Sequence, residues 1–315
     1  MGAYLLRRFG LMLLTLFGIS IIIFVMLRVA PGNIADVLFD AAGYVDPAAK
    51  MRIERDLGLD QPLAVQYTTW ISGLLRGDLG YSYVTDRPAL AEILPRIPVT
   101  ARLAGLSLLL AVLLGVPLGV VSAVRQDTAL DYVVRVVGLS GLSIPAFWLG
   151  LLVLMAFVAW FHTIPIYSAI PQGFWGALTM YMVPSAVVGF GSAALIMRLT
   201  RSSMLEVLRQ DYIRTARAKG ASESVVNFRH ALKNAILPVI TIIGLQAAFL
   251  MGGLVVTETV FNIPGVARFL VDAVRWRDYP IVQNLVMYVA VVVVTINFIV
   301  DMLYAVLDPR IKYVD

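Results

Sequence analysis

The sequence contains no cysteine and only two histidines, His162 and His230. Without cysteine the chain cannot form a disulfide, a thiolate metal site or a cysteine nucleophile. Two histidines this far apart are too few to suggest a metal cage, so we expect no bound metal. The sequence therefore excludes chemistry that depends on cysteine and gives no histidine cluster for a metal.

The sequence also lacks the short motifs of nucleotide-binding and hydrolytic proteins. No Gly-x-x-x-x-Gly-Lys-[Ser/Thr] occurs, so the chain has no P-loop for ATP. His-Glu-x-x-His and Gly-x-Ser-x-Gly are absent as well. We expect that this chain is not an enzyme and that it binds no cofactor of its own.

Apolar residues dominate the composition instead. Hydrophobic residues make up 60% of the 315 positions, and the mean hydropathy is +0.85, whereas soluble domains are about 45–50% apolar. The formal net charge of +5 is small and unevenly placed, which indicates membrane topology and gives no reason to expect a nucleic-acid partner. The composition predicts an all-α membrane protein.

Six apolar stretches are each long enough to cross about 30 Å of hydrocarbon as a helix. They are residues 9–27, 103–124, 136–161, 180–197, 235–256 and 281–307. The short loops that follow the second and fourth stretches carry Lys and Arg, whereas the loop 162–179 carries neither. Because positive charge favours the cytoplasmic side, we expect six transmembrane helices with both termini cytoplasmic.

The long polar segment 30–98 lies outside the cell in this topology. Residues that begin and end helices recur along it. Asp46-Pro47 can begin a helix that Gly58 ends, Gln61-Pro62 can begin a second, and Pro88 to Leu94 has the pattern of a third. The pattern predicts a folded extracytoplasmic segment, which either contacts a ligand or serves only as a packing insert.

Residues 198–238 separate the fourth and fifth stretches and hold eight basic residues against three acidic ones. A Lys or Arg at the centre of a bilayer costs roughly 2.5–3.5 kcal/mol, so eight would cost about 20 kcal/mol or more. This segment therefore lies outside the hydrocarbon, and its charge places it on the cytoplasmic side.

Local signals predict that this basic segment is ordered. Ser203 and Glu206 fit a capping box at the start of a short helix. Asp211 can cap a second helix that Gly220 ends in the left-handed conformation. A third helix is expected from about Ser222 toward Ala235.

The predicted short helices share an apolar edge, which would suit the groove of another protein. Its residues are Met204, Leu205, Leu208, Tyr212 and Ala216. The alternative is a solvated basic loop that only fixes the topology.

Polar or helix-breaking residues interrupt several of the apolar stretches. The third stretch is broken around Ser143 and Pro145, and a broken helix in lipid is tolerated only against protein or a wet cavity. With Gln246 in the fifth stretch, these residues are candidates for lining a pathway, and a packed kink is the alternative. In the sixth stretch we expect Asp301 to pair with a basic loop residue and not to carry protons or ions.

Two glycines in the second stretch, Gly115 and Gly119, stand four residues apart. Small residues at this spacing let helices approach closely in a membrane. We therefore expect this part of the chain to pack tightly against a neighbouring helix, which is a more economical explanation than a gate.

The segment Asp-Tyr-Ile-Arg-Thr-Ala-Arg-Ala-Lys-Gly at 211–220, with 230–235 and Leu237-Pro238, resembles the EAA loop of ABC importer permeases. More narrowly, it is similar to the dipeptide/oligopeptide/nickel branch. Further segments that resemble this branch are 57–62, 77–82, 258–265, 271–280 and 307–312, so the resemblance covers nearly the whole chain. When the motif is aligned on Gly220, its Glu-Ala-Ala positions hold Arg214, Thr215 and Ala216, and Lys233 stands at a proline position. The peptide branch tolerates both departures, so they favour that branch within the family and do not contradict the resemblance to the family.

The resemblance implies a type I ABC importer transmembrane fold in a bacterial inner membrane, with membrane lipid around it. The chain would be one of two homologous permease subunits that together form the pore. Two ABC ATPase subunits would hold ATP and Mg, and a periplasmic or lipoprotein solute-binding protein would deliver cargo. We expect an N-terminal helix with its extracytoplasmic segment in 1–95, the importer domain in 96–306 with a coupling loop at 198–235, and a cytoplasmic tail in 307–315.

The resemblance also assigns roles to residues, because in that family this loop forms the coupling helix seated in the ATPase. The coupling residues it implies are Asp211, Tyr212, Arg214, Thr215, Ala216, Arg217, Lys219 and Gly220. The implied cargo is a dipeptide or oligopeptide. Glutathione, nickel chelates and small oligosaccharides are alternatives, and an ATPase-independent secondary transporter or channel is a more distant one.

Overall fold

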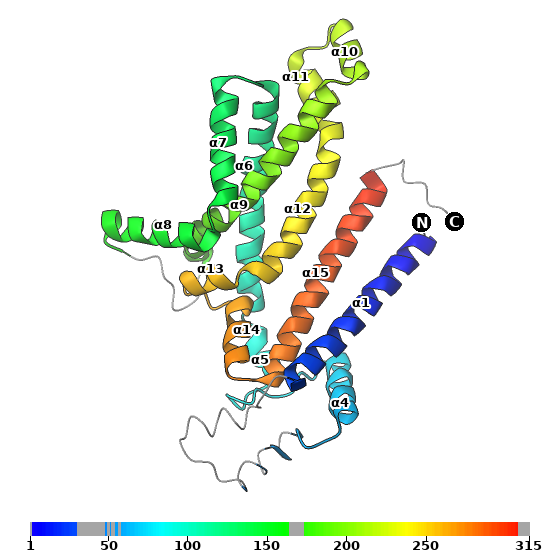
Figure 1. Ribbon diagram of the computed structural model, residues 1–315, viewed down its shortest axis with the longest axis vertical. Coiled ribbons are helices and arrows are strands. Elements are labelled where there is room, and N and C mark those ends of the chain that lie inside the picture. The colour runs from blue at the N-terminus through cyan, green and yellow to red at the C-terminus, as the bar shows by residue number, and fades with distance from the viewer. Residues whose placement is uncertain are drawn as a thin grey trace. The chain divides into compact units, whose positions relative to one another are not determined.

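The computed structural model describes residues 2–29, 48, 51, 54–55, 58–163 and 173–307. Its named elements are all helices, and the described residues add one isolated bridge between Tyr81 and Pro88 (Figure 1). This confirms the all-α fold. Most of the helix predicted from Asp46-Pro47 and the tail 308–315 lie outside the described residues.

The chain divides into two compact units. Unit 1 comprises residues 1–100 and 264–294, and unit 2 comprises residues 101–263 and 295–315. The helices that lie in or begin in unit 1 are α1 (Gly2–Val29), α4 (Leu63–Arg76), α5 (Ala89–Ile93), α6 (Ile97–Val124), α14 (Val266–Arg275) and α15 (Tyr279–Leu307). The remaining helices, all in unit 2, are α7 (Ala129–Ser143), α8 (Ala146–Phe161), α9 (Gly173–Leu208), α10 (Asp211–Ala218), α11 (Glu223–Val225), the π-helix η1 (Val226–Leu232), α12 (Lys233–Gly253) and α13 (Val255–Val260).

Five helices of the described chain are long and apolar enough to cross a membrane, and the count rises to six when the bent pair α7 and α8 is taken as one span. The six predicted stretches are therefore present, but the third is not a continuous helix. Its two halves differ in direction by 103°. Pro145 causes the break, because proline disfavours helical backbone at the residue before it, and Ile144 is extended (φ −87°, ψ 119°).

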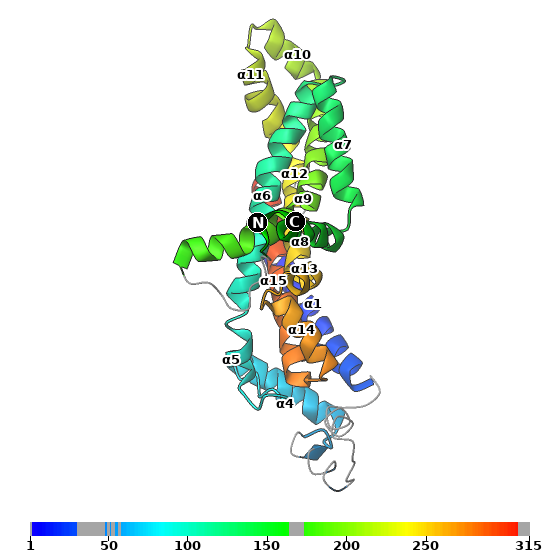
Figure 2. The ribbon, with the colours of Figure 1, turned by 90° about the vertical axis from the view of Figure 1, so that its left-hand side faces the viewer.

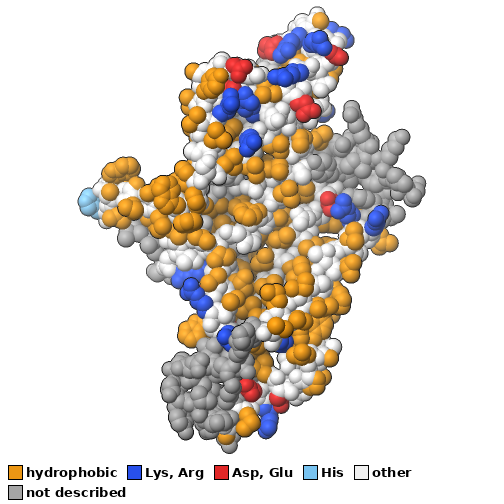
Figure 3. Space-filling view, viewed as in Figure 1, with side chains coloured by type: hydrophobic (Ala, Val, Ile, Leu, Met, Phe, Trp, Pro, Cys, Tyr) orange, Lys and Arg blue, Asp and Glu red, His pale blue; other side chains and the backbone are white. Residues whose placement is uncertain are grey.

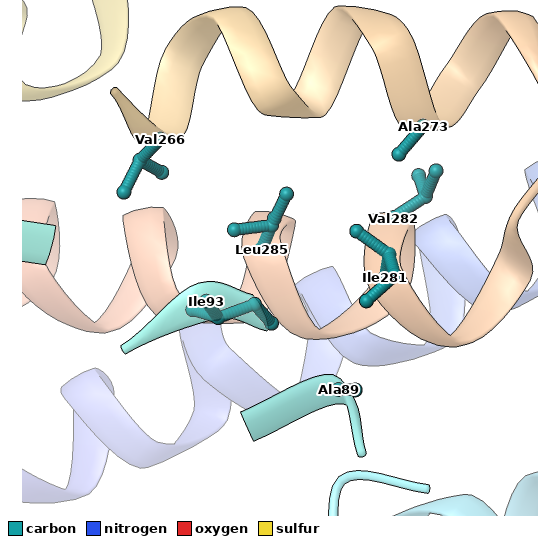
Figure 4. Packing of buried hydrophobic residues seen from close by; sticks show 7 residues of the cluster. All are labelled: Ala89, Ile93, Val266, Ala273, Ile281, Val282 and Leu285. Atoms are coloured by element: carbon teal, nitrogen blue, oxygen red, sulfur yellow. The ribbon is translucent and has the colours of Figure 1, made fainter. Parts of the chain in front are cut away.

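The core of unit 1 lies where α5, α14 and α15 meet. Figure 4 shows its seven buried apolar residues, which are Ala89, Ile93, Val266, Ala273, Ile281, Val282 and Leu285. The helices predicted after Gln61-Pro62 and from Pro88 are present as α4 and α5, and Gly77 ends α4 with a φ of +78°.

Hydrogen bonds to α15 hold the segment that contains α4 and α5. The Asn284 side chain accepts a bond from Trp70 Nε1 (3.2 Å) and donates one to the Leu79 carbonyl (2.7 Å). The buried carboxylate of Asp278, just before α15, accepts bonds from the Ser82 hydroxyl and the Tyr83 amide. The prediction of a folded segment is therefore correct for its described part.

In unit 2, α9 packs between α7 and α12, and small residues permit its close contact with α6. A Cβ atom added to Gly115 would lie 2.8 Å from the Ala193 carbonyl oxygen, and one added to Gly119 would lie 2.6 Å from Cβ of Thr200. Thr200 is completely buried. The predicted close packing at these two glycines is confirmed.

Replacing Gly119 with leucine should therefore destabilise unit 2, because a side chain forced into a packed contact costs about 1–3 kcal/mol. Gly105→Leu is the matched control, since a Cβ on Gly105 in the same helix meets no atom within 4 Å. Thermal unfolding of the purified protein should show a lower midpoint for Gly119→Leu and little change for Gly105→Leu. Equal losses in both variants would contradict this account.

Candidate coupling site

The helix α9 continues through the point where the sequence predicts a new helix to begin. Ser203 lies inside α9, which ends at Leu208, and its side chain is buried. The predicted capping box is therefore wrong. Met204 next to it is completely buried, and this tertiary burial favours continuing the helix over ending it.

The next helix, α10, begins one residue earlier than predicted. Its N-cap is Gln210, whose backbone is extended, and no side chain caps the helix. Asp211 is thus the first helical residue and not the cap. Its carboxylate still suits the positive end of the helix dipole, and it forms an exposed ion pair with Arg214.

A left-handed glycine follows α10, as predicted. Gly220 has a φ of +82°, and its amide donates to the Arg217 carbonyl at 2.9 Å. Because a Cβ at Gly220 would meet no atom within 4 Å, the backbone angle and not crowding requires glycine here.

One residue of α10, Ile213, attaches the helix to the rest of unit 2. Ile213 is completely buried in a cluster formed by residues of α6, α9, α10, η1 and α12. The buried members are Val120, Ala123, Met204, Ile213, Val226, Ala231 and Ala235. Sequence reasoning missed Ile213, although it is the one large aliphatic residue between positions 211 and 220.

The same cluster bears on the interpretation of the apolar edge. Met204, Leu205, Leu208 and Ala216 pack against this cluster or belong to it. Met204 is completely buried and the other three are partly buried, so much of this edge is already packed within the chain. That the edge lies in the groove of another protein stays a prediction. Only Tyr212 of that set is exposed, with 43% of its surface accessible.

The exposed face of α10 is polar and basic. Of the eight candidate coupling residues, seven are exposed and Ala216 is half-buried. In Figure 1 and Figure 2 α10 and α11 project beyond the ends of α6, α9 and α12. Figure 3 shows Lys and Arg side chains gathered over this projection and over the adjoining ends of α7 and α9.

Polar contacts fix the shape of this projection. Arg217 binds Glu223 through two hydrogen bonds of 2.9 and 3.2 Å, which join α10 to α11. Asn234 of α12 donates to the Tyr212 hydroxyl at 2.8 Å. Exposed pairs of this kind contribute about 0–1 kcal/mol each, so they orient α10 more than they anchor it.

The third predicted helix is present, but its geometry differs from the prediction. Ser222 precedes α11 as its N-cap, and the helix continues through η1 into α12. The π-helical turns of η1 bury Val226, Asn227 and Ala231. Pattern reasoning has no signal for such widened turns, which often occur at functional positions.

The three candidate pathway residues do not lie on one element. Ser143 and Pro145 flank the bend between α7 and α8, and both are exposed. Gln246 lies on α12, where its amide donates to Ser192 of α9 at 2.9 Å. Gln246 thus joins two helices of unit 2, and a pathway role for the three residues stays a prediction.

Unit 1 contains a cavity of about 610 Å³ lined mainly by the segment after residue 57 and by the start of α15. Gln283 lines it and is buried, and among the described residues its side-chain nitrogen has no hydrogen-bond partner. Burial raises the pKa of Tyr83, another lining residue, to about 12. The cavity offers polar groups to a guest, and ligand contact by this segment stays a prediction.

Two family models of known proteins match the chain, one in its N-terminal third and one in the remainder. Residues 115–313 match the family described as "Binding-protein-dependent transport system inner membrane component". Residues 1–104 match the family described as the N-terminal part of such membrane components.

Relatives of known name match over nearly their full length. The dipeptide transport system permease protein DppB of Alkalihalophilus pseudofirmus is 38% identical, over 99% of this chain and 100% of its own. The di/tripeptide permease DppB of Pseudomonas aeruginosa is 39% identical, over 99% of each chain. The glutathione transport system permease protein GsiC of Pectobacterium atrosepticum is 40% identical, over 98% of this chain and 99% of its own.

These matches explain the apolar spans, the basic segment that carries α10 and the lack of catalytic motifs together. The chain belongs to the family of binding-protein-dependent transport system inner membrane components and is a multi-pass permease of the bacterial inner membrane.

Proposed function

We propose that this permease forms half of the translocation pore of a peptide importer and that α10 transmits movement from a separate ATPase. The observation that carries the coupling role is the two-sided character of α10. Ile213 packs one side of α10 into a cluster that contains residues of four other helices, while the opposite side is exposed and basic. A helix built in this way can receive a force from outside and pass it inward.

The path of that force runs through packed side chains. A displacement of α10 acts on Met204 of α9, Val226 of η1 and Ala235 of α12 through Ile213, because all of them pack in one cluster. Packed interiors resist compression and transmit strain. Movement of α10 would therefore reorient α9 and α12, the two helices that Gln246 and Ser192 also link.

The charges on α10 suggest the chemistry of its partner. Arg214, Arg217 and Lys219 are exposed, and they would pair with carboxylates or carbonyl groups of an ABC ATPase. We infer two such ATPase subunits, which bind ATP and Mg, a homologous second permease subunit and a solute-binding protein outside. Family membership supports the presence of other transporter subunits.

Peptides are the cargo that the relatives favour. Two of the relatives described above are named as dipeptide or di/tripeptide permeases. Glutathione is the second candidate, because a permease named for glutathione is 40% identical over nearly the whole chain. Nickel chelates and small oligosaccharides are further alternatives without a comparable relative among those described. Uptake of labelled dipeptides and glutathione by cells with and without the permease separates the first two.

Replacing Gly220 with isoleucine should uncouple transport while the protein still inserts. A left-handed backbone costs an L-residue roughly 1–2 kcal/mol, which is about a five- to thirtyfold shift in the population of correctly seated α10. Gly220→Asn is the matched control, since asparagine tolerates this angle. Peptide uptake and ATP hydrolysis of the assembled transporter measure the effect. Wild-type uptake by Gly220→Ile would count against a coupling role.

Truncation of Ile213 should loosen α10 without changing a single charge. Isoleucine to alanine in a packed site costs about 2–5 kcal/mol and isoleucine to valine about 0.5–1.5 kcal/mol. Hydrogen exchange in residues 205–225 should therefore rise slightly in Ile213→Val and strongly in Ile213→Ala, and uptake should fall in the same order. If hydrogen exchange rises but peptide uptake does not fall, the packing of Ile213 has no part in coupling.

The purified single chain should not hydrolyse ATP, because its sequence has no P-loop. Phosphate release by the chain alone, compared with the assembled transporter at equal protein concentration, measures this. Turnover by the chain alone that survives further purification would refute the proposed division of labour.

A further inference from the structure

A groove with a cavity of about 330 Å³ runs between α7 and α9 at the end of unit 2 that leads into α10. The residues that matter here are Arg135, Leu139 and Leu142 of α7 and Met197, Arg198 and Arg201 of α9. None of these residues belongs to the cluster around Ile213.

A buried carboxylate holds one of these arginines in place. Asp131 is completely buried, and it accepts bonds from Arg201 Nε at 2.9 Å and Arg201 Nη2 at 2.8 Å. It also accepts bonds from the Ser122 hydroxyl and the Asp127 amide. Asp131 is thus fully engaged, and Arg201 is fixed with its remaining N–H groups available to the groove.

The other two arginines leave the groove with a positive surplus. Arg135 reaches Asp131 only at 4.0 Å, and Arg198 is exposed and has no hydrogen-bond or ion-pair partner among the described residues. The carboxylate of Asp127, which is exposed, also attracts the Arg201 guanidinium electrostatically. Three arginines against two carboxylates still leave net positive charge, so the groove favours an anion.

The groove is also amphipathic along its length. The helices run antiparallel, because Asp131 of α7 meets Arg201 of α9, whereas Gly141 of α7 lies against Ala194 of α9. The cations therefore gather at the end near α10, and Leu139 and Leu142 extend away from it. Val136 and Val137 beside them are exposed as well, which continues the apolar surface.

We propose that this groove binds an anionic phospholipid. Arg135, Arg198 and the free N–H groups of Arg201 would hold the phosphate, and an acyl chain would lie along Leu139 and Leu142. Basic pockets between membrane helices are suited to such headgroups. We favour a lipid over a protein partner because one molecule then matches both features of the groove. Its phosphate supplies the missing negative charge at the arginine end, and its acyl chain matches the apolar side chains further along.

The leaflet follows from the proposed function. If α10 meets an ATPase inside the cell, the arginine end of the groove faces the inner leaflet. The binding of lipid itself does not depend on coupling, so a test that measures binding without nucleotide or cargo can fail while the coupling role stands, and the reverse also holds.

The test uses the detergent-purified transporter, stripped of lipid and titrated with dioctanoyl phosphatidylglycerol, with dioctanoyl phosphatidylcholine and inorganic phosphate as separate arms. Native mass spectrometry counts the bound molecules. We expect phosphatidylglycerol to bind in preference to phosphatidylcholine, and Arg198→Gln to weaken that binding about fivefold, the effect of one cation near an anionic surface. Arg198→Lys should retain most of it.

Arg125→Gln is the matched control, because Arg125 is an exposed arginine of the loop between α6 and α7 that does not line the groove. It should leave phosphatidylglycerol binding unchanged. Equal binding of the two lipids, or an equal loss in both glutamine variants, would overturn the proposal. Competition by inorganic phosphate at similar concentration would show a free-anion site and overturn it too. So would binding to the single chain that disappears in the assembled transporter, because a subunit would then cover the groove.

Discussion

The packing of Ile213 is the interaction on which the functional end of unit 2 depends. Burying an aliphatic side chain of this size contributes about 1.5–3 kcal/mol, whereas each exposed ion pair around α10 contributes about 0–1 kcal/mol. Ile213 meets residues from α6, α9, η1 and α12 in one cluster. The position of α10 is therefore decided by an apolar contact, and the exposed charges around it contribute little to holding the helix in place.

Much of this architecture could be predicted from the sequence because lipid imposes simple rules. The apolar stretches predicted the spans, since about twenty consecutive apolar residues are the length that a membrane-crossing helix needs. Gly220 predicted a turn, because most other residues avoid the left-handed backbone angle that it adopts. An error arose where tertiary contacts override a local signal, because Ser203 matches a cap but is buried inside α9.

Other features could not be predicted because their causes are distributed along the chain. Pro145 signalled an interruption, yet the 103° change of direction depends on how α7 and α8 pack against α9 and α13. The sequence places Asp131 in the short loop between the second and third apolar stretches, whereas the structure places it in the first turn of α7. Only the antiparallel arrangement of α7 and α9 brings it to Arg201, seventy positions away in sequence, and makes it the centre of a buried network.

The π-helical turns of η1 have a consequence for how such permeases diverge. A helix that already accommodates widened turns can lose or gain one residue there and convert locally between π and α geometry. In an α-helix each residue adds a rotation of about 100°. A one-residue deletion in a regular α-helix would turn every later side chain by that angle. A deletion between Val226 and Leu232 can instead be absorbed when a π-turn becomes an α-turn, so the later side chains of α12 keep their direction relative to α10. Related permeases can therefore differ by one residue in this short stretch and still present the same face of α12 to its neighbouring helices.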